Sequence, residues 1–289
     1  MKEAAQGEPI QHEVFEKPFQ VKPVFEVWET PENYRRFPSG ADLPPTVKVW
    51  RIRTAEAEKG NPSEPLGVVS NCWGYDDSPD AEILTAGYNV GKENGGVGVG
   101  RHGNFLQWGF GALPSTMTDA GQKFFLNCIC YIAKFDGKAP LIHRESGNRF
   151  EPVRLAMAMS YISDKKFFQS TFAPDLMEKY GSDWQGLMKF YQENYEWIYC
   201  DKTYQIDDDL KSLGIPSNRK PETLERLIAL LADPQKGELA RKLLGRYTVE
   251  SFQTPEEWQA WLEKNRSRIY FSDVGGYKFR IVPEGYLVK

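Results

Sequence analysis

The chain has 289 residues and a net charge of −4 at pH 7, with 36 Lys and Arg residues against 40 Asp and Glu residues. This length allows two domains of ordinary size, and the 40% share of hydrophobic residues excludes a disordered polymer. Because the charge balance is not basic and no stretch approaches the ~18 apolar residues of a membrane helix, we expect neither a nucleic-acid partner nor a membrane span.

Residues 1–45 form a proline-rich segment. Between residues 10 and 45 the prolines are Pro18, Pro23, Pro31, Pro38, Pro44 and Pro45. Proline lacks a backbone N–H donor and fixes φ, so a long helix is excluded here. We therefore predict an extended segment, made of edge strand or wrapping loop, that precedes the first domain.

Residues 46–140 carry the pattern of a sheet covered by one helix. Alternation predicts a strand over Thr46–Thr54, and shorter apolar runs follow at Leu66–Ser70 and Ala81–Thr85. The segment Val97–Phe110 is rich in Gly and aromatic residues, which favours a strand pair or a bulged strand. We expect a mixed or antiparallel sheet.

The helix of this domain is predicted to begin at Thr116 or Thr118 and to reach about Lys134. Its expected apolar face consists of Phe125, Cys128, Ile129, Ile132 and Phe135. Gly137 then fits a left-handed terminator.

Residues 150–289 predict a mainly helical domain that ends in a β-hairpin. Ser182–Gln185 fits a capping box, Pro221 opens another helix, and Thr254–Glu257 combines a cap, a first-turn proline and a glutamate. The hairpin is predicted to turn at Asp273–Gly276. The whole chain is therefore predicted to be α+β.

Gly98–Gly103 matches the dinucleotide-binding pattern G-x-G-x-x-G letter for letter. In dinucleotide-binding folds the glycines of this pattern lead into a helix, whereas Asn104–Phe110 has the pattern of a strand. Gly96, Gly98 and Gly100 instead share one face of a strand and leave room there for a backbone, an aromatic ring or a ligand. Nucleotide binding is not expected.

The four cysteines show no metal-binding spacing. They are Cys72, Cys128, Cys130 and Cys200. On a helix, Cys128 and Cys130 point about 200° apart, so they cannot hold one ion together. We expect buried free thiols, no metal site and no cofactor.

Two segments rich in polar and aromatic residues are the candidate ligand site. Their residues are Trp73, Asp76, Asp77, Arg101, His102, Asn104 and Trp108. Placed at one end of the sheet, they would line an aromatic pocket suited to a polar small molecule such as a sugar. In the alternative arrangement, His102 and Asn104 bond to loop backbone and the tryptophans fill the core.

No nucleophile-elbow or zinc-protease motif occurs in the chain, so no catalytic residue is assigned. The favoured function is a non-catalytic binding or interaction module for a polar small molecule or a protein partner. The alternative is a hydrolase of a polar substrate that uses His102 with Asp76 or Asp77. A third interpretation is a structural partner of a longer enzyme chain.

A further set of motifs points to a family. They are Gly87-Tyr88-Asn89, Val99 to Phe105, Trp108-Gly109-Phe110, Pro114, Met117-Thr118, Asn127, Tyr131-Ile132 and Phe135-Asp136-Gly137. Over residues 10–140 the chain resembles uncharacterised bacterial proteins, many of them secreted. These are distantly similar to the C-terminal part of trehalose-utilisation-like domains, which are class I glutamine-amidotransferase-like.

The resemblance implies a late strand pair ending in Gly-Phe and then a helix that bears an Asn. The first parallel half of that fold and its nucleophile would lie before residue 10, so no catalytic residue is carried over. Residues 1–9 lack the apolar region of a signal peptide, which predicts a cytoplasmic protein. The resemblance implies a periplasmic or secreted one if a signal peptide has been removed.

Overall fold

The structure is a computed structural model, and it describes residues 3–7, 9–35, 43–60, 67–75, 77–87, 89, 92, 96–162 and 165–286. The chain divides into two compact units. The sheet unit comprises Met1–Asp76, Asp80–Leu141 and Leu287–Lys289, and the helical unit comprises Asp77–Pro79 and Ile142–Tyr286. Helices and an antiparallel sheet are both present, which confirms the α+β class.

The sheet unit is built on a six-stranded sheet of order β2-β3-β1-β4-β5-β6. Its strands are β1 Ala4–Gln6, β2 Phe25–Glu29, β3 Thr46–Arg51, β4 Ala81–Ala86, β5 Val97–His102 and β6 Phe105–Trp108. All neighbouring strands pair antiparallel. Residues 1–45 thus supply an edge strand, β2, and an interior strand, β1, whose small residues Ala4 and Ala5 are fully buried.

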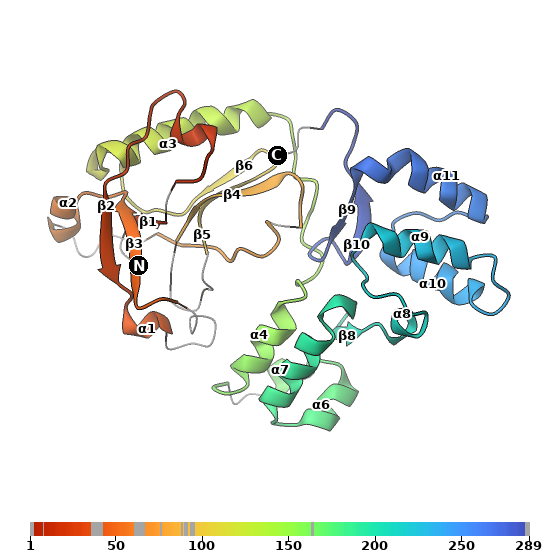
Figure 1. The fold of residues 1–289 in the computed structure, drawn as a ribbon. Coiled ribbons are helices and arrows are strands. Elements are labelled where there is room, and N and C mark those ends of the chain that lie inside the picture. Colours follow the sequence, from red (N-terminus) through yellow and green to blue (C-terminus); the bar gives the residue numbers. More distant parts are fainter. Residues whose placement is uncertain are drawn as a thin grey trace. The chain divides into compact units, whose positions relative to one another are not determined.

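Helix α3, Asp119–Ile132, lies along one face of this sheet (Figure 1). The Thr118 side chain caps its start by accepting from the Gly121 N–H. A 3-10 turn over Ala133–Phe135 follows, and Gly137 then adopts φ +72°. Two short helices complete the unit, α1 Glu32–Arg35 and α2 Ala55–Gly60.

The face of α3 that contacts the sheet differs in part from the predicted one, of which Cys128 and, in the following turn, Phe135 are buried. Phe124, Cys128 and Tyr131 are buried there, whereas Ile129 is 50% exposed. Phe125 and Ile132 lie only partly buried at the edge of the core. Apolar residues occur nearly all round this helix, so periodicity alone did not identify the packed face.

The expected strand pair over the glycine-rich segment is confirmed as β5–β6, with Gly103 at φ +56° in its turn. Gly100 lies opposite Gln107 in this pair. A Cβ on Gly100 would lie 2.6 Å from the Tyr75 ring. At Gly100 the glycine face therefore makes room for an aromatic ring, one of the three occupants considered for it.

The helical unit contains short helices and two hairpins. The helices are α4 Glu151–Ala158, α5 Lys165–Gln169, α6 Pro174–Tyr180, α7 Trp184–Glu193, α8 Asp208–Ser212, α9 Pro221–Leu230, α10 Gly237–Tyr247 and α11 Pro255–Asn265. The hairpins pair β7 Ile198–Cys200 with β8 Tyr204–Ile206, and β9 Ile269–Ser272 with β10 Lys278–Ile281. The terminal hairpin confirms the prediction for this end of the chain.

Two helix starts test the predicted caps of this unit. The Thr254 capping box is confirmed, because its hydroxyl accepts from the Glu257 N–H and the Glu257 carboxylate accepts from the Thr254 N–H. The box predicted at Ser182 is wrong. Asp183 is the cap of α7 instead, and its carboxylate accepts from the Gly186 N–H.

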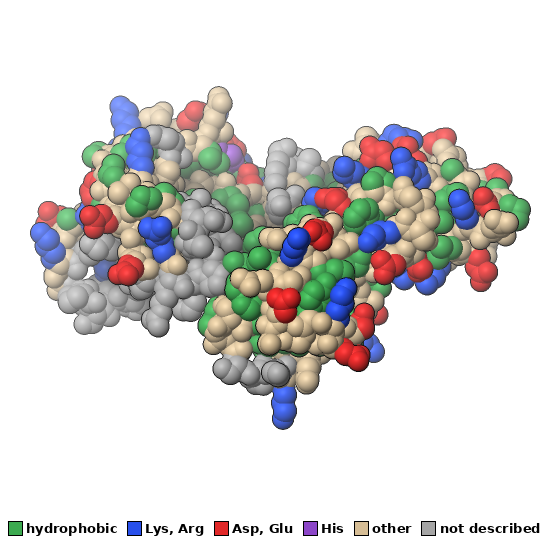
Figure 2. Space-filling model, turned by 60° about the horizontal axis from the view of Figure 1, so that its bottom comes forward, with side chains coloured by type: hydrophobic (Ala, Val, Ile, Leu, Met, Phe, Trp, Pro, Cys, Tyr) green, Lys and Arg blue, Asp and Glu red, His purple; other side chains and the backbone are tan. Residues whose placement is uncertain are grey.

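The remaining features of the fold are the apolarity of its helices and the charges on its surface. No described helix combines the length and apolarity needed to cross a bilayer. On the face drawn in Figure 2, acidic and basic side chains are intermixed and form no large area of one sign. That mixture agrees with the nearly balanced charge of the sequence.

Candidate functional site

Two of the predicted site residues on the β5–β6 hairpin, His102 and Trp108, lie on opposite faces of the sheet. Trp108 is opposite Val99 and packs with it in the core beneath α3, where its ring contacts Phe124 and Phe125. His102 is three residues from Val99, and successive side chains of a strand alternate between faces. Trp108 therefore has a packing role, and one pocket cannot be lined by both side chains.

The described carboxylate beside His102 is Asp80. His102 Nε2 lies 3.5 Å from Asp80 Oδ1, the His102 side chain is 32% exposed, and Asp80 is fully buried. The other Asp80 oxygen accepts from the Leu141 N–H over 2.9 Å. Asp76, one of the two carboxylates predicted for His102, lies outside the described residues.

Three further predicted residues are described, namely Asp77, Trp73 and Asn104. Asp77 is part of the helical unit, where its Oδ2 accepts from the N–H groups of Asp273 and Val274 over 2.8 and 3.2 Å. Trp73 is half-buried in a turn. The Asn104 Oδ1 is buried without a hydrogen-bond partner among the described residues.

Arg101 belongs to a buried polar group that we call the Glu82 cluster: His12, Glu82, Arg101 and Tyr131. Glu82 and Arg101 are opposite each other on β4 and β5, and Arg101 Nε donates to Glu82 Oε1 over 2.5 Å. The Tyr131 hydroxyl donates to the same oxygen, and His12 Nε2 lies 3.4 Å from Glu82 Oε2. One carboxylate therefore gathers three side chains from three parts of the sheet unit.

The contacts fix the charge and orientation of the cluster. Burial raises the pKa of Glu82, but the hydrogen bonds from His12, Tyr131 and Arg101, together with the Arg101 charge, lower it to about 2. Burial and the bonded Glu82 carboxylate raise the pKa of Tyr131. His12 Nδ1 accepts from the Val14 N–H, which places the ring proton on Nε2, facing Glu82.

The loop that carries His12 is held against α3 by one buried amide, Asn127. Its Oδ1 accepts from the Phe19 N–H over 3.0 Å, and its Nδ2 donates to the carbonyls of Val14 and Phe19 over 2.8 and 2.7 Å. Asn127 is fully buried. The loop is therefore positioned by hydrogen bonds before any ligand arrives.

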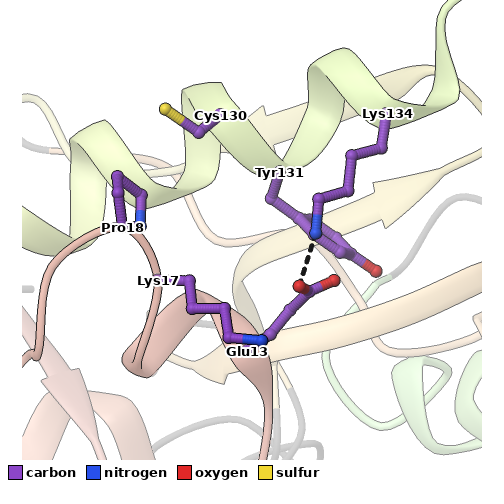
Figure 3. Close-up of a pocket in the computed structure, with 6 residues that line it drawn as sticks. All are labelled: Glu13, Lys17, Pro18, Cys130, Tyr131 and Lys134. Carbon is purple, nitrogen blue, oxygen red and sulfur yellow. Dashed lines mark hydrogen bonds and ion pairs between the residues drawn. The ribbon is translucent and has the colours of Figure 1, made fainter.

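A cavity of about 260 Å³ lies between this loop and the C-terminal half of α3, beside the Glu82 cluster. It is lined by Glu13, Lys17, Pro18, Cys130, Tyr131 and Lys134. As Figure 3 shows, Cys130 and Tyr131 come from α3, Lys134 comes from the 3-10 turn that follows it, and the loop supplies the first three residues. Lys134 reaches across to form an ion pair with Glu13.

The sequence offered little sign of this cavity. Cys130 and Lys134 are four residues apart, within the helix predicted to reach about Lys134, and this spacing was the one local signal. The Lys134–Glu13 pair joins residues 121 positions apart. Only the packing of the loop on α3 brings these two together.

No protein-family model, curated protein or solved structure matches the chain. The family resemblance over residues 10–140 therefore stays a proposal. The assignment of a function depends on the geometry of the described residues.

Proposed function

We propose that the sheet unit is a binding module for a polar small molecule with an anionic group, such as an organic or sugar acid. The site is the cavity between α3 and the loop of residues 13–18. The observation that carries the proposal is the cavity lining, which contains two lysines, Lys17 and Lys134, and one carboxylate, Glu13, which is ion-paired with Lys134. The lining therefore has a net positive charge.

The form of the cavity supports a small ligand. Its volume of about 260 Å³ is just under the ~300–1,000 Å³ typical of ligand pockets. The rings of Tyr131 and Pro18 supply apolar wall, and the two lysines supply cations. The Asn127 hydrogen bonds hold the loop in place, which reduces the entropy lost when a ligand binds.

The chemistry of the Glu82 cluster supports binding in preference to catalysis. An acid–base catalyst works best when its pKa lies near the working pH. The pKa of Glu82 is about 2 and that of Tyr131 is raised above its ordinary value, so neither exchanges protons readily near pH 7. The cluster instead fixes the Tyr131 ring that forms part of the cavity wall.

A second candidate function is hydrolysis of a polar substrate with His102 as general base. It is favoured by the position of His102 Nε2 beside the buried Asp80 carboxylate, which resembles the base-and-orienting-group pair of many hydrolases. In this proposal Asp80 takes the role first considered for Asp76 or Asp77. The substitution His102→Gln would then abolish turnover and leave cavity binding unchanged.

The proposed family resemblance is supported by the roles of its motifs. The β5–β6 pair continues into Gly109-Phe110, with Phe110 in the core, and Asn127 of α3 anchors a loop. These features fit the strand pair and Asn-bearing helix that the resemblance implies. If the resemblance holds, the protein is proposed to be periplasmic or secreted, as many members of that family are.

The binding proposal is tested by mapping amide NMR shifts during titration with glucuronate, citrate and benzoate, and with uncharged glucose as the matched control. We expect the anions to perturb residues 13–18 and 130–134, and the substitutions Lys17→Gln and Lys134→Gln to weaken this by several-fold. Lys123→Gln is the control variant, because Lys123 lies on the same helix outside the cavity lining. Failure of all three anions to perturb the cavity, or equal loss in Lys123→Gln, would overturn the proposal.

A further inference from the structure

Strand β2 forms one edge of the six-stranded sheet, so the outer side of its backbone pairs with no described strand (Figure 1). Its pairing with β3 runs from Phe25 to Glu29 without a shift in register. Just beyond the strand, the Thr30 N–H donates to the Pro45 carbonyl over 2.9 Å. Bonded and non-bonded pairs alternate along an antiparallel ladder, so this bond shows which backbone groups of β2 face β3 and which face outward.

Every second residue of β2 directs its N–H and C=O groups away from the sheet. Since the Thr30 pair bonds inward, Trp28 and Glu26 bond to β3 as well. The outward-facing residues are therefore Phe25, Val27 and Glu29. No proline interrupts them, so they present a row of donors and acceptors to which a further strand can pair.

The side chains along this edge are apolar in the middle and charged at the ends. Val27, the central residue of the strand, is 72% exposed, and Val24 just before the strand is 79% exposed. Lys22 lies exposed before the strand, and Glu29 lies exposed at its end. Neither Lys22 nor Glu29 forms an ion pair with another described residue. The edge is thus positive at its N-terminal end and negative at its C-terminal end.

We propose that β2 pairs antiparallel with β2 of a second copy of the chain, with the two Val27 residues opposite each other on a two-fold axis. Antiparallel pairing brings the Lys22 end of one copy to the Glu29 end of the other, whereas parallel pairing would place like charges together. Glu29 of the second copy would lie opposite Phe25, where the Lys48 Nζ is 4.3 Å from the ring centre. The edge is therefore complementary to itself, which favours a second copy as its partner.

This register also satisfies the outward backbone groups of both strands. With the Val27 residues opposite each other, Phe25 of each copy faces Glu29 of the other, so every outward-facing residue has a partner. A two-fold contact of this kind is closed and stops at a dimer. The residues that line the cavity lie outside β2, so the inference goes beyond the binding proposal and does not depend on it.

The test is sedimentation of the whole chain between about 1 µM and about 1 mM, a range that covers weak to moderate self-association. We expect a monomer–dimer equilibrium. Val27→Lys and Val27→Glu should each raise the dissociation constant by about fivefold or more, because like charges then meet on the axis. An equimolar mixture of the two variants should dimerise again, because opposite charges then meet there. A chain that stays monomeric throughout, or a mixture no tighter than either variant alone, would overturn the inference.

Phe105→Lys is the matched control variant. Phe105 is also a large apolar residue, 68% exposed, and it lies on β6 at the opposite edge of the same sheet. The variant adds the same charge to the sheet unit and should dimerise like wild type. If Phe105→Lys weakened the dimer as much as Val27→Lys, the contact would not be at β2 and the inference would be wrong.

Amide hydrogen exchange locates the contact residue by residue. As the protein concentration rises, protection should increase at the amides of Phe25, Val27 and Glu29. The amides of Glu26 and Trp28 already bond to β3, so they should stay unchanged and serve as internal controls. A dimer whose added protection lies outside β2 would contradict the proposed pairing.

Discussion

Glu82 and Arg101 lie directly opposite each other on β4 and β5, and Arg101 Nε donates to Glu82 Oε1 over 2.5 Å. Their side chains are 13% and 1% exposed. The Arg101 guanidinium also stacks over the Phe135 ring, 3.8 Å from its centre. Because neither charge is well solvated, each depends on the other for stabilisation.

Removing one partner of this pair should destabilise the sheet unit strongly. Arg101→Met leaves the Glu82 carboxylate buried with its main cation gone, and we expect a loss of about 3–5 kcal/mol in the free energy of unfolding. The double variant Glu82→Gln with Arg101→Met should lose less than Arg101→Met alone. Urea unfolding of the single and double variants measures this coupling, and additive losses would contradict it.

The low pKa of Glu82 predicts how stability changes in acid. The pKa falls from 4.5 to about 2 on folding, so between these values the unfolded chain binds the proton first. The ionised Glu82 therefore contributes about 3 kcal/mol to the free energy of unfolding; this contribution is complete above about pH 5 and is lost as the pH falls toward 2. The measurement is the free energy of unfolding of wild type and of Glu82→Gln at pH values across this range. If the two proteins lost stability in parallel as the pH fell, the prediction would be wrong.

Asn127 should control the order of the loop that forms one cavity wall. Asn127→Ala removes three hydrogen bonds to Val14 and Phe19, and we expect a loss of about 2 kcal/mol in unfolding free energy. Hydrogen exchange at the Phe19 amide should accelerate, and binding of the anionic probes should weaken. Asn194→Ala is the control, because the hydrogen bonds of Asn194, to the Phe190 carbonyl and from Lys211 Nζ, lie in the helical unit. Unchanged exchange at Phe19 would count against this role.

The parts of the fold that were predictable depend on residues close together in sequence. The Thr254 capping box, the Thr118 cap and the turn after β9 each involve a few adjacent positions, and all three are confirmed. The packed face of α3 was not predictable in this way. Leu126 and Ile129 of this helix are apolar yet 45% and 50% exposed, while the polar Asn127 is buried and bonded to the loop.

The candidate site was less predictable than the fold, because long-range packing assembles it. Of its cluster residues only Arg101 was predicted as a ligand-binding residue, and its partners Glu82 and Tyr131 lie 19 and 30 residues away in sequence. Whether Glu82, Arg101 and Tyr131 come into contact depends on the β4–β5 register and on the rotation of α3 about its axis. Composition and periodicity report neither quantity.

The close approach of Tyr75 to Gly100 gives a final prediction. The Gly100 backbone does not adopt a positive φ, so alanine would ordinarily be tolerated or favourable there. A Cβ at this position would lie 2.6 Å from the Tyr75 ring and 2.8 Å from a Val97 methyl group. We therefore expect Gly100→Ala to lower the unfolding free energy by about 1–3 kcal/mol.

The cause of that loss is separable with two further variants. The double variant Gly100→Ala with Tyr75→Ala should recover part of the stability lost in Gly100→Ala, because the ring that the new methyl group would contact is absent. Gly60→Ala is the matched control, since a Cβ at Gly60 meets no atom of the described residues within 4 Å, and it should leave stability unchanged or slightly higher. A Gly100→Ala protein as stable as wild type in urea would mean that Tyr75 does not occupy this face in solution.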